Sequence, residues 1–251
     1  MITISLVSHG HRDLVANVLT DLVNFPEVAS VVLTLNMPEE IPTIPDALQT
    51  KVVLIRNDQP KGFASNHNSA FSQCKTAYFC VLNPDARLPD NPFPRLLQTL
   101  AEQKAVMAAP VVTNSLGKLE DSVRTFPTPL GIFLKLLGVS KGTFQFAKGD
   151  KPFYPHWVAG MFMLFESKAF ANLHGFDESF FLYYEDVDIC ARMWKQGMRL
   201  AVCPKVAVVH DAQRDSHRKM KYLYWHISSM IRFFIKHLGR LPNPDRNTGI
   251  V

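Results

Sequence analysis

Apolar residues along the first half of the chain follow two alternating spacings. Short apolar runs, typical of buried strands, occur at residues 2–7, 31–35, 52–55, 78–82 and 106–112. Between them, apolar residues recur every three or four positions at 11–24, 64–73 and 91–103, which predicts amphipathic helices. This β-α-β alternation predicts an α/β sandwich around a mostly parallel sheet.

The pattern becomes less regular after residue 112. A turn is expected at 114–117, and residues 125–155 predict a loop-rich insertion with a short apolar helix at 130–137. A strand is expected at 157–165, a helix at 189–195, and short strands near Leu200 and at 206–209. No internal repeat or low-complexity linker divides the chain, so we expect a single domain over residues 1–251.

The composition is that of an ordinary soluble globular protein. Of the 251 residues, 47% are hydrophobic and 20% are charged, which excludes a disordered or fibrous chain. No apolar run approaches the ~18–20 residues that span a bilayer, and the first residues lack the pattern of a signal peptide. No CxxC pair occurs among Cys74, Cys80, Cys190 and Cys203, so we expect reduced thiols in a cytoplasmic protein rather than a zinc knuckle or redox motif.

The net charge of +5 is mild, but basic residues gather near the C-terminus. Interleaved there with aromatic residues are Arg214, His217, Arg218, Lys219, Lys221, Arg232, Lys236 and His237. A basic, aromatic-rich helix suits an anionic membrane surface, with nucleic acid as the competing partner. Because these residues cluster in one helix, we expect peripheral membrane contact and no nucleic-acid binding. An ordinary surface helix with its apolar side on the core is the simpler alternative.

The segment 180–188 places aromatic residues directly before the carboxylates Glu185, Asp186 and Asp188. Carboxylates beside large apolar rings lose hydration, which raises their pKa and suits them to accept a proton. The alternative is structural, because acidic residues in a first helical turn stabilise a helix by about 0.3–1 kcal/mol each.

No glycine-rich phosphate loop of the GxGxxG or GxxxxGK[ST] type is present. A bound diphosphate would therefore need a divalent cation held by oxygen ligands. Asn83-Pro84-Asp85 follows a buried strand, where Asp85 would project into the crevice at the end of the sheet, although the tripeptide is also a good turn. His210 is a second candidate ligand, but a lone histidine is more often structural.

Several segments together resemble one known family. They are Asn57 with KGFASNHN at 61–68, VLNPDARL at 81–88, WVAGM at 157–161, GFDE, FF and YEDVD within 175–188, and VVH at 208–210 with Ser216. In this order, over residues 2–216, they resemble the inverting, nucleotide-sugar-dependent glycosyltransferases of family 2, in particular the rhamnosyltransferase-like branch.

This resemblance implies a GT-A fold with a nucleotide-binding half at 1–112, a metal, acceptor and catalytic half at 113–216, and a basic amphipathic helix and tail at 217–251. The implied donor is dTDP-rhamnose or a UDP-sugar, and the implied cofactor is Mn²⁺ or Mg²⁺. The implied acceptor is a hydroxyl of a growing, lipid-linked bacterial surface glycan at the inner face of the cytoplasmic membrane.

The resemblance also assigns roles to residues. Asp186 would be the catalytic base, with Glu185 as the alternative, while Asp85 and His210 would bind the metal. The sugar or acceptor would contact Trp157, Gly160 and His174. The donor would be bound by Ser8, Asn36, Asn57, Gly62, Asn68, Asn83 and Asp85.

Five positions depart from the family pattern. Asn83 replaces the first carboxylate of the Asp-x-Asp motif, and Asn36 stands where an acid is common. His9-Gly10 stands where Tyr-Asn is more frequent, and His174 replaces a glycine. These departures motivate an alternative function, a catalytically silent module with the same fold that binds a nucleotide sugar or glycan.

Overall fold

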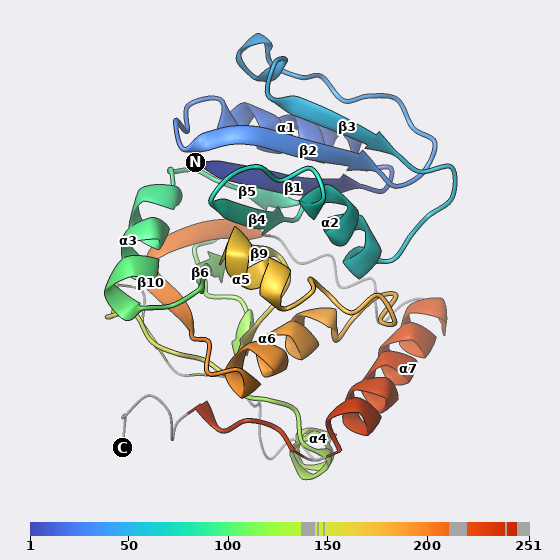
Figure 1. Ribbon diagram of the computed structural model, residues 1–251, viewed down its shortest axis with the longest axis vertical. Helices are drawn as coiled ribbons and strands as arrows, with labels where there is room; N and C mark the ends of the chain where they lie inside the picture. Colours follow the sequence, from blue (N-terminus) through green and yellow to red (C-terminus); the bar gives the residue numbers. More distant parts are fainter. Residues whose placement is uncertain (137–143, 145, 148, 211–219, 239, 245–251) are drawn as a thin grey trace.

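The computed structural model describes residues 1–136, 144, 146–147, 149–210, 220–238 and 240–244, which are arranged around an eight-stranded sheet (Figure 1). In spatial order its strands are β3 (Val52–Arg56), β2 (Val28–Leu35), β1 (Ile2–Ser8), β4 (Tyr78–Leu82), β9 (Phe162–Glu166), β6 (Met107–Thr113), β10 (Leu200–His210) and β5 (Ala86–Arg87). Strands β3, β2, β1 and β4 pair in parallel, as do β6 and β10. Strand β9 is antiparallel to β4 and β6, and β5 is antiparallel to β10. The expected α/β fold with a mostly parallel sheet is confirmed.

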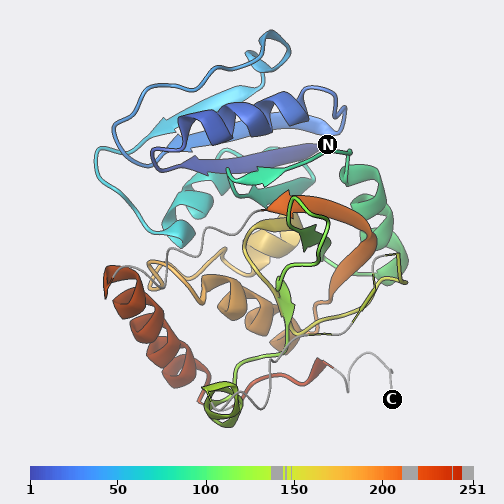
Figure 2. The same ribbon diagram turned by 180° about the vertical axis from the view of Figure 1, so that it is seen from behind.

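Helices cover both faces of the sheet (Figures 1 and 2). They are α1 (Arg12–Leu22), α2 (Phe63–Phe71), α3 (Phe93–Gln103), α4 (Pro129–Leu136), α5 (Ser167–Asn172), α6 (Glu185–Lys195) and α7 (Met220–His237), with a short 3₁₀ helix at Asp46–Leu48. Helices α1 and α3 share one core with alternate strand residues, and α2, α5 and α6 share the other. Strand β4 shows the alternation that separates the cores, since Phe79 and Val81 face one and Cys80 and Leu82 the other.

The prediction of a single strand at 157–165 is wrong. Strand β8 (Trp157–Val158) pairs with β7 (Val123–Arg124) in a separate two-stranded sheet, and β9 begins only at Phe162. The apolar pattern is continuous across both strands, but the backbone N–H of Gly160 bonds to a side chain instead of a neighbouring strand. The chain therefore changes sheets at residues 159–161.

The two short strands expected near Leu200 and at 206–209 form one strand, β10. Its register against β6 shifts between Cys203 and Ala207, where Pro204 has no N–H to donate. The interruption in the sequence pattern thus marks an irregularity within a strand and not its end.

The short apolar helix expected at 130–137 is present as α4, and the C-terminal helix is present as α7. The expectations for Arg214, Ser216, His217, Arg218 and Lys219 concern positions that lie outside the described residues. Within the described part of the chain, no helix has the length and apolarity to cross a membrane. All four cysteines are free thiols, as expected.

Candidate active site

The parallel strands β1, β2, β3 and β4 end at the same edge of the sheet, and polar residues follow each of them. Asn57 Nδ2 donates to Asn36 Oδ1 at 2.9 Å and to Asn66 Oδ1 at 2.8 Å. Asn36 in turn holds the backbone of Lys61 through both its side-chain oxygen and its side-chain nitrogen, each at 2.9 Å. These amides fix the ends of β2 and β3 to the segment that enters α2.

Ser8, at the end of β1, donates to Glu39 Oε2 at 2.8 Å, and the Gly10 N–H donates to Glu39 Oε1 at 3.2 Å. Gly10 has a positive φ of 75°, which a glycine adopts without strain. Glu39 was not identified from the sequence. It supplies a carboxylate three residues after Asn36, the position where the family more often has an acid. The feature of the sequence that could have identified it is the Glu39-Glu40 pair shortly after a strand.

Asp85 and His210 lie together. The antiparallel pairing of β5 with β10 sets His210 opposite Ala86, and His210 Nε2 is 3.0 Å from Asp85 Oδ2. Burial acts to raise the pKa of Asp85, but the hydrogen bond and charge of His210 outweigh it, so the pKa lies below its usual value. Asp85 is therefore a carboxylate at neutral pH. Its Oδ1 is buried and accepts no hydrogen bond from the described residues.

This pair suits a divalent metal. A carboxylate with one uncommitted oxygen and an imidazole nitrogen are ligands that Mn²⁺ accepts, and Mg²⁺ also takes the oxygen. No group of three or more His, Cys, Asp or Glu side chains that could bind a metal occurs among the described residues. A metal at Asp85 and His210 would therefore take its other ligands from a phosphate group and water.

Asp186 lies in the first turn of α6. Its Oδ2 accepts the Gly160 N–H at 3.0 Å, and its Oδ1 accepts the Val187 N–H at 2.8 Å. Burial raises the pKa of Asp186, although these N–H groups and the charge of Arg124 oppose the shift. Burial, followed by the charge of Asp186, raises the pKa of neighbouring Glu185 well above its usual value, and Glu185 Oε2 has no hydrogen-bond partner among the described residues.

Residues 159–161 connect Asp186 to the turn that contains Asp85. The Gly160 N–H bonds to Asp186, and the carbonyl of Met161 accepts the Asn83 N–H at 2.9 Å. A Cβ at position 160 would lie 3.0 Å from Phe63 Cζ and 3.7 Å from Asp186 Cβ. The structure thus brings Asn83 and Asp85 to the same edge of the sheet as Asp186, and only a glycine fits comfortably between α2 and α6.

Trp157 and Arg124 lie on the two-stranded sheet whose strand β8 packs against α6. They are paired in the β7–β8 register, and the guanidinium carbon of Arg124 lies 5.6 Å from the centre of the Trp157 ring. Arg124 also forms an ion pair with Asp121. No sequence motif pointed to Arg124, because only the pairing of β7 with β8 places it near the acidic residues. Burial and then the charge of Asp186 raise the pKa of the adjacent Tyr184 to about 12.

Gly62 and Asn68, both assigned to the donor by resemblance, contact the loop that precedes α6. A Cβ on Gly62 would lie 2.5 Å from the carbonyl oxygen of Phe181, which accepts the N–H of Phe63 at 2.9 Å. The Asn68 amide donates to the Phe176 carbonyl at 2.8 Å and accepts the Phe176 N–H at 2.9 Å. Both residues therefore position the loop, and their contact with a nucleotide stays a prediction.

His174 lies apart from Trp157 and Gly160. It is an exposed residue with a φ of 56° at the end of α5, where a shallow hollow is also lined by Arg192 and Lys236. Its proposed role toward the acceptor stays a prediction.

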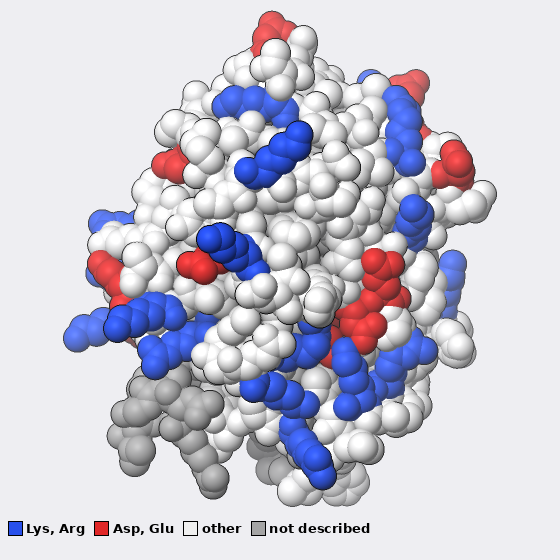
Figure 3. Space-filling model, in the orientation of Figure 1, with Lys and Arg blue, Asp and Glu red and all other residues white. Residues whose placement is uncertain are grey.

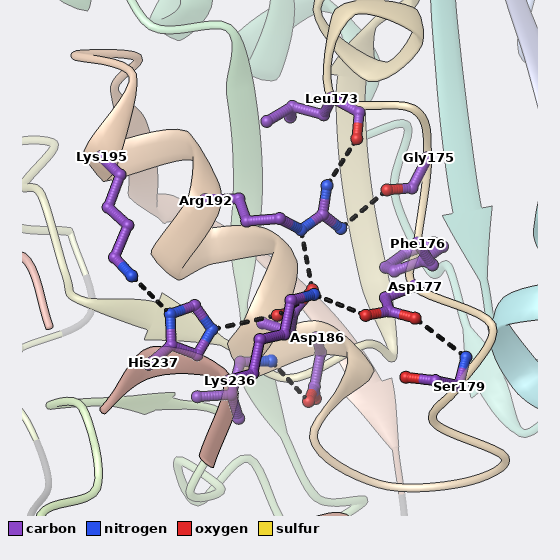
Figure 4. A network of polar contacts seen from close by, with 12 residues as sticks. Leu173, Gly175, Phe176, Asp177, Ser179, Asp186, Arg192, Lys195, Lys236 and His237 are labelled. Atoms are coloured by element: carbon purple, nitrogen blue, oxygen red, sulfur yellow. Dashed lines mark hydrogen bonds and ion pairs between the residues drawn. The ribbon is translucent and has the colours of Figure 1, made fainter. Parts of the chain in front are cut away.

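Asp188, the third acid of the motif, is completely buried in an ion cluster between α6 and α7 (Figure 4). Its carboxylate contacts His237 Nε2 at 3.0 Å, Lys236 Nζ at 2.7 Å and Arg192 Nε at 2.7 Å. Arg192 also donates to the carbonyls of Leu173 and Gly175. The cluster ties α6 to α7 and to the loop after α5, so Asp188 has a structural role distinct from that of Asp186.

The backbone that leads into α6 is strained. Tyr183 and Tyr184 have φ angles of 69° and 68°, a region that non-glycine residues rarely adopt. The Leu182 carbonyl accepts the hydroxyl of Ser229 at 2.9 Å, and the Tyr184 ring packs 5.4 Å from that of Phe233. Helix α7 thus supports the conformation from which Glu185 and Asp186 project.

Comparison with known proteins adds a consistent set of matches. The family model described as "Glycosyltransferase like family 2" matches residues 2–224. The rhamnosyltransferase WbbL of Escherichia coli (strain K12) is 26% identical over 94% of this chain and 93% of its own length. An N-acetylglucosaminyl-diphospho-decaprenol L-rhamnosyltransferase of Mycobacterium tuberculosis is 26% identical over 55% of this chain, a match that spans 48% of that protein.

Solved structures share the fold. A mannosyltransferase from Pyrobaculum calidifontis, in complex with GDP-Man and Mn²⁺, superposes with a TM-score of 0.64 at 14% identity, over 97% of this chain and 66% of that one. GalNAc-T7 with UDP, GalNAc and Mn²⁺ superposes with a TM-score of 0.61 at 15% identity, over 84% of this chain and 43% of that one. The chain therefore has the GT-A fold.

Proposed function

Because the chain belongs to the glycosyltransferase-like family 2, we propose that it transfers a sugar from a nucleotide diphosphate donor to a hydroxyl group, with inversion of the anomeric configuration. The observation that carries this proposal is the connection of the Asp85–His210 pair to Asp186 through residues 159–161. A pair suited to bind a metal and a half-buried carboxylate at one edge of the sheet are the two groups that this reaction needs.

Asp186 is the base. Burial raises its pKa, so its carboxylate accepts a proton more readily than an exposed aspartate does. The N–H groups of Gly160 and Val187 orient the carboxylate and leave each oxygen a second lone pair for the acceptor hydroxyl. As that hydroxyl loses its proton to Asp186, its oxygen bonds to the anomeric carbon from the side opposite the diphosphate. The bond from the anomeric carbon to the diphosphate oxygen breaks, and the diphosphate leaves with the electron pair.

Asp85 and His210 would hold Mn²⁺ or Mg²⁺, which when bound stabilises the negative charge of the leaving diphosphate. The nucleoside would lie along the ends of β1, β2 and β3. The polar groups that the chain offers there are Ser8, Glu39, Asn36 and Asn57, and Asn83 follows the neighbouring strand β4.

For the donor we propose dTDP-rhamnose first and a UDP-hexose second, because two relatives are named as rhamnosyltransferases. For the acceptor we propose a lipid-linked glycan precursor, since the name of one relative specifies a diphospho-decaprenol acceptor. The ring of Trp157 offers a face for a sugar, and Arg124 beside it offers a cation for the phosphates. Such an acceptor places the protein at the cytoplasmic face of the membrane.

The test replaces Asp186 by Asn and measures transfer from dTDP-rhamnose and UDP-hexoses to a diphosphate-linked acceptor with Mn²⁺. We expect kcat to fall by about 10²–10⁴-fold with little change in donor affinity, because a general base contributes roughly that factor. Glu185→Gln tests the alternative base, and Asp90→Asn is a matched exposed control. Wild-type transfer by Asp186→Asn would show that the base is misassigned.

The configuration of the product provides a second readout. NMR of the new glycosidic bond should show an anomeric configuration opposite to that of the donor, and retention would reject the direct displacement. Tight, metal-independent nucleotide binding without transfer to any acceptor would instead favour the silent binding module.

A further inference from the structure

The outward face of α7 is apolar over its whole length. Large exposed hydrophobic residues recur there every three or four positions, a spacing that places them on one side of a helix. We call the following set the outer stripe: Met220, Leu223, Tyr224, Ile227, Ile231, Ile235 and Leu238. Ile231 is 50% exposed and Ile235 is 65% exposed, so the described residues of the chain leave the stripe open.

The opposite face of α7 packs on the core. Ser229, Phe233 and His237 are buried there, with Ser229 bonded to Leu182 and His237 to Asp188. Helix α7 is therefore held in place by its inner face and ion contacts, and the outer stripe contributes nothing to that packing. A surface helix normally presents polar side chains to water, so a continuous exposed apolar stripe indicates an interaction site.

Helix α4 extends this surface. It lies beside the C-terminal end of α7 in both views (Figures 1 and 2), and its Leu130 and Phe133 are 67% and 57% exposed. Between the two helices a groove of about 660 Å³ is lined mainly by apolar residues, among them Phe126, Pro129, Phe234 and Leu241. The apolar surface thus continues from α7 to α4.

The charged side chains of α7 itself have one sign, although a group of Asp and Glu side chains, among them Asp177 paired with Lys236, lies beside the basic residues (Figure 3). Residues 220–238 contain no Asp or Glu, while Lys221 and Arg232 lie along one border of the stripe and Arg240 is exposed just beyond it. Lys and Arg side chains gather over the lower part of the molecule, where α6 and α7 lie (Figure 3). An anionic surface complements this arrangement, whereas a second copy of the stripe would bring like charges together.

We propose that the outer stripe and the exposed residues of α4 insert into the interface of an anionic lipid bilayer. Because the inner face of α7 stays bound to the core, the helix lies parallel to the membrane and only its outer side chains enter. Helices of this type bury their apolar face about 5–10 Å into the boundary between headgroups and acyl chains. Membrane binding itself is argued independently of the proposed function. Only its purpose, to bring the active site to a lipid-linked acceptor, rests on the proposed function.

The test is co-sedimentation of the full chain with phosphatidylcholine vesicles, with and without about 30 mol% of the anionic lipid phosphatidylglycerol, because an anionic surface attracts Lys and Arg side chains. The variant Ile227→Gln/Ile231→Gln/Ile235→Gln removes the centre of the stripe. The control Val53→Gln/Leu116→Gln removes exposed apolar residues from other elements. We expect the wild type and the control to bind the anionic vesicles and the triple variant to bind at least tenfold more weakly.

Three results would overturn the inference. The first two are no binding of the wild type to anionic vesicles and equal vesicle binding by the triple variant. The third is a wild-type dimer in sedimentation velocity that the triple substitution abolishes without changing vesicle binding. Transfer to a water-soluble acceptor separates this inference from the proposed function. The triple variant should keep that activity. If the wild type binds vesicles but transfers no sugar, the proposed function is wrong and the outer stripe is still a membrane-binding surface.

Discussion

At the residue scale, the pKa values of three aspartates in the proposed motifs shift in different directions because their surroundings differ. Asp85 is stabilised as a carboxylate by His210, and Asp188 by His237, Arg192 and Lys236, so that the pKa of each is lowered despite burial. Among the described residues no cation forms an ion pair with Asp186, and burial raises its pKa. The same residue type is thus suited to binding a cation, to joining two helices or to accepting a proton.

Replacing Arg124 by Gln should move the acidic limb of the log(kcat/KM)–pH profile to higher pH. The charge of Arg124 lowers the pKa of Asp186, so its removal raises that pKa, and a higher pH is then needed to form the carboxylate. The measurement is the pH profile from pH 4 to 9 with a water-soluble acceptor. Arg95→Gln, an exposed control on α3, should leave the limb in place, and an unshifted limb in Arg124→Gln would contradict the prediction.

Replacing Gly160 by Ala should lower kcat by about tenfold or more while donor affinity changes little. The new Cβ would lie 3.0 Å from Phe63 Cζ, and small displacements of a catalytic group reduce its rate strongly. Steady-state kinetics together with calorimetric donor binding check this. The double variant Gly160→Ala/Phe63→Leu provides the control, because a smaller side chain at 63 should restore part of the rate.

At the element scale, helix α6 combines two functions. Asp186 in its first turn faces Gly160, while Asp188 holds α7 through the ion cluster. Replacing Asp188 by Asn should therefore lower the free energy of unfolding by about 3 kcal/mol, the low end for a broken buried ion pair, because Asp188 is fully buried whereas Arg192 and Lys236 remain partly exposed. Urea denaturation at pH 7 measures this, with Asp90→Asn as the exposed control.

The pH dependence of this stability follows from the lowered pKa of Asp188. A carboxylate whose pKa is lower in the folded than in the unfolded state stabilises the fold above its unfolded pKa, and this contribution is lost as the pH falls through the folded pKa. The free energies of unfolding of the wild type and of Asp188→Asn should thus become more similar below about pH 4. A constant difference from pH 7 to pH 3 would rule out the ion cluster as its cause.

Most elements could be predicted from the sequence because their hydrophobic spacing matches their burial. The errors fall where another interaction determines the backbone. At 159–161 a side chain takes the N–H that a strand would use, and in β10 a proline shifts the register without ending the strand. Neither effect changes the apolar pattern.

For the candidate site, the sequence could indicate residues that lie in ordered motifs, such as Asp85 and Asp186. It could not indicate Arg124, since its position depends on the pairing of two short strands from distant segments. Nor could the resemblance show that the side chain of Asn68 is bonded to the loop at 176. A motif records which residues recur, but their contacts depend on the tertiary fold.

At the scale of the whole molecule, donor and metal should bind together. Nucleoside diphosphate with Mn²⁺ should raise the melting temperature more than either alone, because a ligand at 100 times its Kd stabilises the folded state by about 2.7 kcal/mol. Asp85→Asn should abolish the effect of Mn²⁺ on nucleotide affinity in calorimetry, while Asp90→Asn should preserve it. Equal nucleotide affinity with and without Mn²⁺ in the wild type would argue against a metal at Asp85 and His210.

The direct contact of Gly62 and Phe63 with Phe181 links the segment proposed to bind the donor to the loop that precedes the proposed base, Asp186. A donor that shifts Gly62 and Phe63 must also displace the loop at Phe181. If bound donor changes the affinity for the acceptor, bound acceptor must change the affinity for the donor by the same factor. Two substrates would then bind cooperatively without touching the same side chain. Acceptor titrations at zero and saturating donor would measure that coupling free energy, and Gly62→Ala should alter it.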